Sequence, residues 1–133
     1  MDDIKALLIN TDGSTQSITL PRDTSLRLEA LQQHVGGLID VVHMLRDDGQ
    51  CADGIINNEA KILNLAVNEL GTDAMGPYDL LPNEWIAGPM VVMGAPDELG
   101  VETDIPQDLA DEIIAMEHRY YRQTPAQDQG LAP

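Results

Sequence analysis

The strongest constraint on the fold is a turn signal between two short apolar runs near the start of the chain. Asp12-Gly13 separates the run 4–10 (IKALLIN) from the run 15–21 (TQSITLP), in which polar and apolar residues alternate. A tight turn between paired strands needs a residue with positive φ, and glycine adopts that conformation without steric cost. We therefore predict a β-hairpin over residues 4–20.

A helix is expected directly after this hairpin, over residues 22–37. Asp23, Thr24 or Ser25 can cap its first turn, since each offers a side-chain oxygen to the free backbone N–H groups. Apolar residues then recur at helical spacing, which predicts a stripe that faces the core. The stripe consists of Leu28, Leu31 and Val35, with Leu26 leading into it.

Gly36 and Gly37 could form a phosphate-binding loop or could simply end this helix. Phosphate sites use the N-terminus of a helix, where N–H groups point outward and the dipole is positive. The glycine pair follows the helix instead, so we predict that Gly36 is its left-handed C-terminal cap. The chain then turns into a strand at 38–45. A polar loop at 46–54 connects that strand to residues 55–57, which gives a second hairpin.

The next stretch is less regular. Residues 58–68 fit a strand and a helix equally well, because their leucines and valine satisfy both periodicities. Residues 69–84 are rich in glycine and proline, so we expect a loop there with one helical turn. The run 85–94 is typical of a strand. Within it Gly88-Pro89 predicts a bulge or an edge position, because proline has no N–H to donate.

A second helix is expected over residues 105–123. Pro106 suits the first helical position and Asp104 can cap the helix. Its apolar stripe consists of Leu109, Ile113, Met116 and Tyr120. The remaining residues, 123–133, are predicted to be a disordered tail.

This order of elements predicts an α+β fold with a single domain over residues 1–122. The sheet is expected to be small, mixed or antiparallel, and to start with the hairpin. One helix follows the hairpin and a C-terminal helix packs on the sheet, with both helices on one side. A hairpin followed by a helix is also how a β-grasp fold begins.

Charge limits the classes of partner. The chain has 23 acidic and 7 basic residues, which gives a net charge of −16. It carries no basic patch that could neutralise phosphates, so direct binding to nucleic acid or to an anionic membrane is not expected. The acidic surface serves either solubility or the binding of a basic partner protein. With no Phe, one Trp and three Tyr, the core must consist of aliphatic residues and methionine.

The setting expected for this chain is the cytoplasm. Cys51 is the only cysteine, so no internal disulfide can form, and a reducing compartment is the simplest environment. The N-terminal residues are acidic and do not resemble a signal peptide, and no apolar run of membrane-spanning length occurs.

No established catalytic or metal motif is present. The acidic segment 47–54 lacks the spacing and the final Glu of a calcium loop. Cys51 and His43 could pair as nucleophile and base, although a structural thiol is the simpler interpretation. His34 near a helix C-terminus and His118 on a helix face have no partner at zinc-binding spacing. We therefore predict no catalytic residue, metal or cofactor, which favours a binding protein over an enzyme.

The most suggestive polar cluster lies between residues 57 and 68. Amide and charged side chains alternate there with apolar ones, which is typical of turns and also of binding surfaces. The predicted binding residues are Asn58, Glu59, Lys61 and Asn68.

Three blocks of the sequence resemble domain-of-unknown-function family 3846, a group of small proteins of phages, bacteria and mobile elements. The family pattern runs Leu-x-x-x-Val-Gly-Gly-x-Ile-Glu-Val, then an Asn-Glu pair followed by Lys, Leu and Asn, then Ile-x-Gly. The matching residues are Leu31, Val35, Gly36, Gly37, Ile39, Asp40 and Val41, then Asn58, Glu59, Lys61, Leu65 and Asn68, then Ile86 and Gly88. The resemblance spans about residues 4–120. This chain has Glu69 where the family often has a base after the second Asn, which weakens an anion-binding role for that block.

The resemblance implies a phage or mobile-element origin and no particular activity. Our first hypothesis is therefore a non-enzymatic accessory protein that binds a host or phage protein through its acidic surface. A DNA-mimic inhibitor of a nucleic-acid-binding protein is one alternative. A small-metabolite or nucleotide binder or enzyme that uses the segment 57–68 is another. Homo-oligomerisation stays open.

Overall fold

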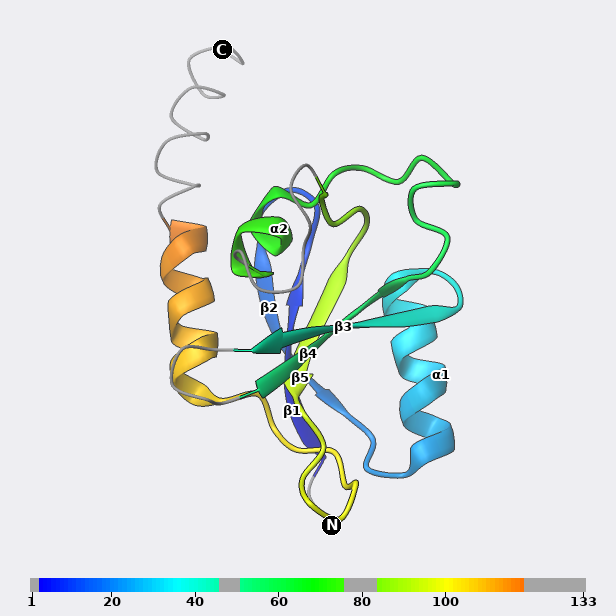
Figure 1. Cartoon of the computed structure of the whole chain (residues 1–133), viewed down its shortest axis with the longest axis vertical. Helices are drawn as coiled ribbons and strands as arrows, with labels where there is room; N and C mark the ends of the chain where they lie inside the picture. The colour runs from blue at the N-terminus through cyan, green and yellow to red at the C-terminus, as the bar shows by residue number, and fades with distance from the viewer. Residues whose placement is uncertain (1–2, 46–50, 76–83, 119–133) are drawn as a thin grey trace.

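A five-stranded antiparallel sheet forms the centre of the computed structural model, which describes residues 3–45, 51–75 and 84–118 (Figure 1). The strands are β1 (Ile4–Ile9), β2 (Thr15–Leu20), β3 (Ile39–Leu45), β4 (Cys51–Asn57) and β5 (Met90–Gly94). Their order in the sheet is β2-β1-β5-β4-β3, and every neighbouring pair is antiparallel. The two predicted hairpins are confirmed. The last strand in sequence lies between them.

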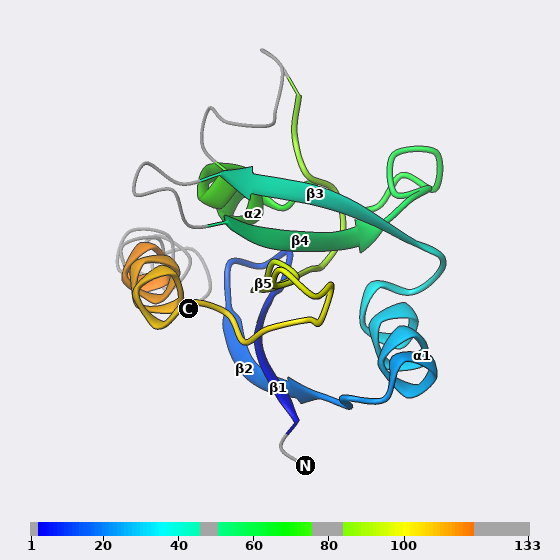
Figure 2. The ribbon, with the colours of Figure 1, turned by 60° about the horizontal axis from the view of Figure 1, so that its bottom comes forward.

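The described residues form three helices, which cover both faces of this sheet. They are α1 (Thr24–Val35), α2 (Glu69–Met75) and a helix over residues 107–118. Leu31 of α1 packs with the even-numbered residues of β1, whereas α2 and the helix 107–118 pack with Leu7 and Ile9. Because alternate residues of a strand face opposite sides, α1 and the helix 107–118 lie on opposite faces (Figure 2). The α+β prediction is confirmed, but the expectation of helices on one side is wrong.

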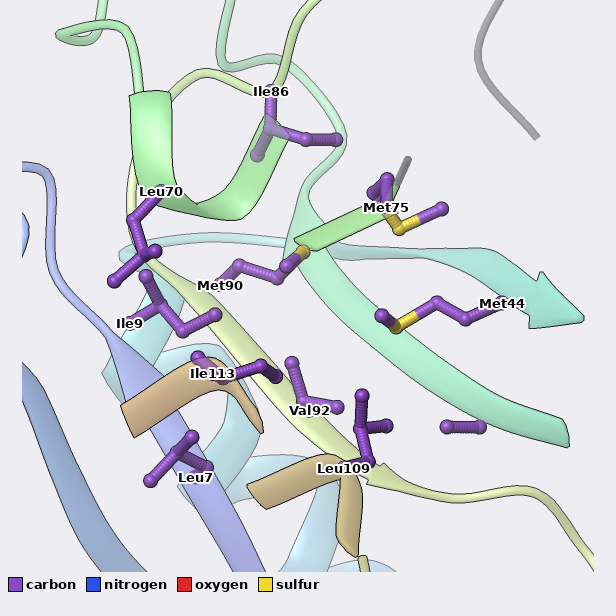
Figure 3. Packing of buried hydrophobic residues seen from close by; sticks show 11 residues of the cluster. Leu7, Ile9, Met44, Leu70, Met75, Ile86, Met90, Val92, Leu109 and Ile113 are labelled. Carbon is purple, nitrogen blue, oxygen red and sulfur yellow. The ribbon is translucent and has the colours of Figure 1, made fainter. Parts of the chain in front are cut away.

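The larger core lies on the face that α2 and the helix 107–118 cover (Figure 3). Its fully buried members include Ile9, Leu70, Met75, Met90 and Ile113. No aromatic side chain takes part among the described residues, as the composition predicts. Methionine fills irregular gaps well because its side chain is unbranched and flexible, so it replaces aromatic bulk in this core.

The turn of the first hairpin uses Gly13 as predicted, with φ of 90°. The loop spans residues 10–14, longer than a two-residue turn, and the Asn10 N–H donates to the Ser14 carbonyl at 2.8 Å. The Asp12 carboxylate accepts bonds from the Ser14 hydroxyl and N–H, and these bonds lower the pKa of Asp12. Side-chain capping of this kind fixes the loop that aligns β1 and β2.

Both ends of α1 are capped as the sequence predicts. The Asp23 carboxylate accepts the Leu26 N–H at 3.0 Å, and Gly36 is left-handed with φ of 82°. The Gly36 N–H donates to the Gln32 carbonyl at 2.8 Å, so the glycine pair ends the helix. The phosphate-loop alternative therefore does not apply to Gly36 in this structure.

The predicted core stripe of α1 is only half right. Leu31 and Val35 are buried, but Leu28 and Leu26 are 43% and 56% exposed. Arg27, four residues before Leu31, is half-buried instead, and its guanidinium donates to the carbonyls of Pro21 and Arg22, just before the helix begins. Leucine spacing alone could not reveal that an arginine would be more buried than two leucines in the first turns of this helix, since a long charged side chain can bury its stem.

Two further predictions need correction. Strand β4 begins at Cys51, so residues 51–54 are strand and not loop. Pro89 does not mark an edge, because β5 begins one residue later and lies between β1 and β4. Gly88, with φ of 79°, turns the chain into that central position.

The ambiguous segment 58–68 is neither strand nor helix. Residues 58–64 form consecutive turns, in which Asn64 has a positive φ of 56°. Val67 then makes an isolated bridge with Ala87. Residues 69–75, expected to hold one helical turn in a loop, form the seven-residue helix α2.

The C-terminal helix is described over residues 107–118, and Leu109 and Ile113 are buried as predicted. Asp104 does not cap it, because its Oδ1 accepts the Lys5 N–H at 2.9 Å. Tyr120 and the predicted tail 123–133 lie outside the described residues. In the described part of the chain, no helix is long and apolar enough to cross a bilayer.

The backbone passes very close to residues 103–104 at Gly94, the last residue of β5, and this close approach predicts the effect of a substitution on stability. A Cβ at Gly94 would overlap the Thr103 side chain and the Asp104 carbonyl. Gly94→Ala should therefore lower the free energy of unfolding by about 2–3 kcal/mol, the upper part of the range for overpacking. Gly100→Ala is the control, since no atom lies within 4 Å and only its left-handed φ of 78° opposes alanine, at a cost of about 1 kcal/mol. Urea denaturation would measure the free energy of unfolding of both variants. Equal losses would contradict the close approach of residues 103–104 to Gly94.

Candidate functional site

The predicted binding segment borders a pocket of about 250 Å³ next to edge strand β3. The turns at 58–62 form one wall and residues 84–87, which lead into β5, form the other. The floor comes from β3 and β4. The lining residues are Asp40, Val42, Ile56, Asn57, Asn58, Glu59, Ala60, Lys61, Ile62, Glu84, Trp85, Ile86 and Ala87.

Three of the four predicted residues lie at this pocket. Asn58, Glu59 and Lys61 line it and are exposed. Asn68 does not line it and is fully buried. The sequence cluster therefore divides into a surface part and an internal part, which periodicity could not distinguish.

Asn57 fixes the turn that presents the surface part. Its buried side chain donates from Nδ2 to the Val35 carbonyl at 3.2 Å and accepts the Glu59 N–H at 2.8 Å. One amide thus joins the C-terminus of α1 to the turns after β4. Gly37 packs so closely on this amide that a Cβ there would lie 2.9 Å from Nδ2.

Trp85 is the site residue that sequence analysis missed. The Lys61 ammonium lies 4.3 Å from the centre of the Trp85 ring, and the indole is 44% exposed. A cation at this distance from an indole face is attracted by the ring quadrupole. One signal in the sequence could have indicated it: Trp85 is the only tryptophan of an acidic chain, and it directly follows Glu84 at the start of the strand-like run 85–94.

The pocket has a negative lining with an apolar margin. Asp40, Glu59 and Glu84 contribute three carboxylates against the one ammonium of Lys61. Ile62, which lines the pocket beside Trp85, is 77% exposed. We call Ile62 and Trp85 the apolar rim. An acidic pocket with an exposed apolar rim can accept a cationic side chain whose neighbours are apolar.

Asn68 performs a structural task. Its Nδ2 donates to the carbonyls of Ile9 and Gly88 at 3.0 and 2.9 Å, and its Oδ1 accepts the Gly71 N–H at 2.8 Å. The side chain therefore caps α2 and ties that helix to the end of β1 and to the approach to β5. Each bond satisfies a backbone group that water cannot reach.

A second polar cluster lies on the α1 face. His43 Nδ1 is 2.9 Å from Asp53 Oδ1, and the imidazole is 76% exposed while the carboxylate is 9% exposed. The strand register places Cys51 opposite Leu45, whereas His43 lies opposite Asp53. His43 is therefore paired directly across the strands with Asp53, and Cys51 lies two positions along β4 from that pair. No group of three or more metal-binding side chains occurs in the described ranges.

Comparison with known proteins identifies the family. The family model described as Domain of unknown function (DUF3846) matches residues 4–118, which is most of the chain. The chain belongs to the DUF3846 family. Its match spans both hairpins, the pocket and all three helices, so the pocket and the buried Asn68 lie inside the family domain. No curated protein and no solved structure matches the chain significantly.

The structural role of Asn68 and the surface role of Asn58 predict different effects of substitution on the free energy of unfolding. Asn68→Ala would leave two carbonyls and one N–H buried without partners, so the free energy of unfolding should fall by about 3 kcal/mol or more. Asn58→Ala at the exposed pocket wall should change it by less than about 0.5 kcal/mol. Urea denaturation measures both variants. A small loss for Asn68→Ala would show that its three hydrogen bonds contribute little.

Glu102, near the second polar cluster, gives a pH prediction. Burial raises the pKa of Glu102, Asp53 raises it further, and Arg27 offsets part of the effect. Because the folded pKa lies above the unfolded one, the charged form destabilises the fold at neutral pH and protonation relieves this. Glu102→Gln should therefore be more stable than wild type at pH 7, with the gain vanishing below the ordinary pKa of glutamate. The exposed Glu98→Gln serves as control for loss of one charge, and thermal unfolding across pH measures both.

Proposed function

We propose that this DUF3846 protein is a non-enzymatic accessory protein that binds a basic segment of another protein at the pocket beside β3. A lysine or arginine of the partner enters among Asp40, Glu59 and Glu84, and apolar neighbours of that residue cover the rim. The observation that carries the proposal is the exposed Ile62 and Trp85 at the mouth of an acidic pocket.

The size of the pocket supports a protein side chain over a metabolite. Its volume of about 250 Å³ is below the roughly 300–1,000 Å³ that is usual for small-molecule sites. One long side chain of a partner needs less room, and its backbone would remain outside. The small-metabolite or nucleotide alternative is therefore less well supported by this site, and nucleotide phosphates would face three carboxylates.

The charge of the whole chain supports a basic partner. A net charge of −16 attracts cationic proteins at long range and speeds encounter at low salt. A basic partner that normally binds nucleic acid would make the protein a DNA-mimic inhibitor, the alternative within this proposal.

The setting we propose is the cytoplasm, or the cytoplasm of the host if a phage encodes the protein. The single cysteine supports this setting, because a chain with one cysteine forms no internal disulfide.

Removal of the apolar rim should weaken partner binding. Ile62→Ser with Trp85→Ser removes the residues that would be desolvated at the centre of the interface, so affinity should fall at least about tenfold. Leu99→Ser with Val101→Ser deletes two exposed apolar residues elsewhere and should not change affinity. The measurement is affinity capture from lysate of the natural host with each tagged variant, then titration of the captured protein.

The carboxylates provide a second comparison. Glu59→Gln with Glu84→Gln should weaken the complex and reduce its salt dependence, whereas Glu29→Gln with Glu98→Gln removes equal charge away from the pocket. A captured protein that binds all four double variants equally would place the interface elsewhere. Capture of no protein by wild type would reject the proposal.

A further inference from the structure

The outer edge of β2 has no strand partner within the described residues. β2 is the terminal strand of the sheet, and no other described strand lies beyond it. Its register with β1 is unbroken from Thr15 to Leu20, and the Asn10–Ser14 bond continues the same ladder. Hydrogen-bonded pairs alternate in an antiparallel ladder. The backbone groups of Thr15, Ser17 and Thr19 therefore point away from β1.

This edge lacks the features that normally prevent strand addition. Its sequence, TQSITL, contains no charged residue, no proline and no bulge, although 23% of the chain is charged. The opposite edge strand, β3, carries Asp40 and His43, and the Asp40 carboxylate accepts the Val41 N–H at 2.9 Å. A regular, uncharged edge is a template for another strand, whereas charges and side-chain capping protect an edge.

The surroundings of β2 also differ in charge from the rest of the molecule. A groove of about 600 Å³ follows the strand, bordered by β1, the end of α1 and the helix 107–118. Its lining includes Lys5 and His34 and contains no carboxylate. Apolar side chains line it as well, among them Ile18 and Ile114.

We propose that β2 pairs with β2 of a second copy of this chain, so that two sheets join into one sheet of ten strands. Only residues whose backbone groups point outward can form the new hydrogen bonds. A two-fold axis through Ser17 satisfies this condition, because Thr15 then pairs with Thr19 of the other copy and Ser17 pairs with itself. The pocket beside β3 lies at the opposite edge and stays open in both copies.

Charge complementarity selects a second copy as the occupant. Lys5 lies beside Thr19 in the ladder, and Glu117 accepts a hydrogen bond from the Thr15 hydroxyl at the other end of β2. Antiparallel pairing therefore brings Lys5 of each copy close to Glu117 of the other. The same symmetry brings the Arg22 end of one strand beside Asp12 of its partner. Repulsion between the two acidic bodies acts over longer distances, and physiological salt screens it beyond about 8 Å.

Cysteine cross-linking tests the register directly. Residues paired across the axis have Cα atoms about 5.5 Å apart, within the roughly 4.4–6.8 Å that a disulfide spans. Ser17→Cys in a Cys51→Ser background should therefore give a covalent dimer under mild oxidation. Thr19→Cys in the same background should not, because the two copies of that residue lie about 13 Å apart along the strands. Cross-linking of both variants at equal rates would overturn the register.

Charge at the axis tests the interface without cross-links. Sedimentation equilibrium should give twice the monomer mass for wild type, and the monomer mass for Ser17→Lys or Ser17→Glu alone, since like charges then meet at the centre. A mixture of these two variants should recover dimers. Val41→Lys places the same charge at the β3 edge and should leave the dimer intact. A wild-type protein that stays monomeric at high micromolar concentration overturns the proposal, as does a Ser17→Lys protein that still dimerises.

Discussion

Insertion of β5 between the two hairpins is the constraint on which the rest of the structure depends. The hairpins β1–β2 and β3–β4 are local, but the inner edges, at β1 and β4, stay unpaired until β5 pairs with both of them. That pairing buries Val91 and Met93 against α1 and Met90 and Val92 against α2 and the helix 107–118. One strand thus completes both cores, and its ladder with β1 connects residues as far apart in the chain as Leu7 and Val92.

The pocket is a consequence of how the chain enters β5. Residues 84–87 must approach the sheet beside the turns at 58–62, and the bridge between Val67 and Ala87 holds the two segments together. Asn68 secures the same region from within by binding Ile9, Gly88 and Gly71. The buried Asn68 amide holds the pocket walls in place. The exposed side chains of Glu59, Lys61 and Trp85 are therefore not needed to maintain the fold.

The two edge strands, β3 and β2, differ in charge and in how far their backbone is capped, so they favour different modes of recognition. At β3 the backbone is partly capped by Asp40 and the neighbouring surface is acidic, which favours recognition through side chains. At β2 the strand is neutral and regular, which favours recognition through backbone hydrogen bonds.

Local signals in the sequence determined both hairpins, the ends of α1, the aliphatic core and the family, because turn and cap residues act within a few positions. Three of four predicted binding residues also lie at one pocket. Only the tertiary structure decided that Asn68 is internal, that Trp85 completes the site, and that Pro89 leads into a central strand. It also placed helices on both faces and left Leu28 exposed. Each of these outcomes depends on β5 meeting distant strands, and no local pattern encodes which face or partner a residue meets once such long-range pairing forms.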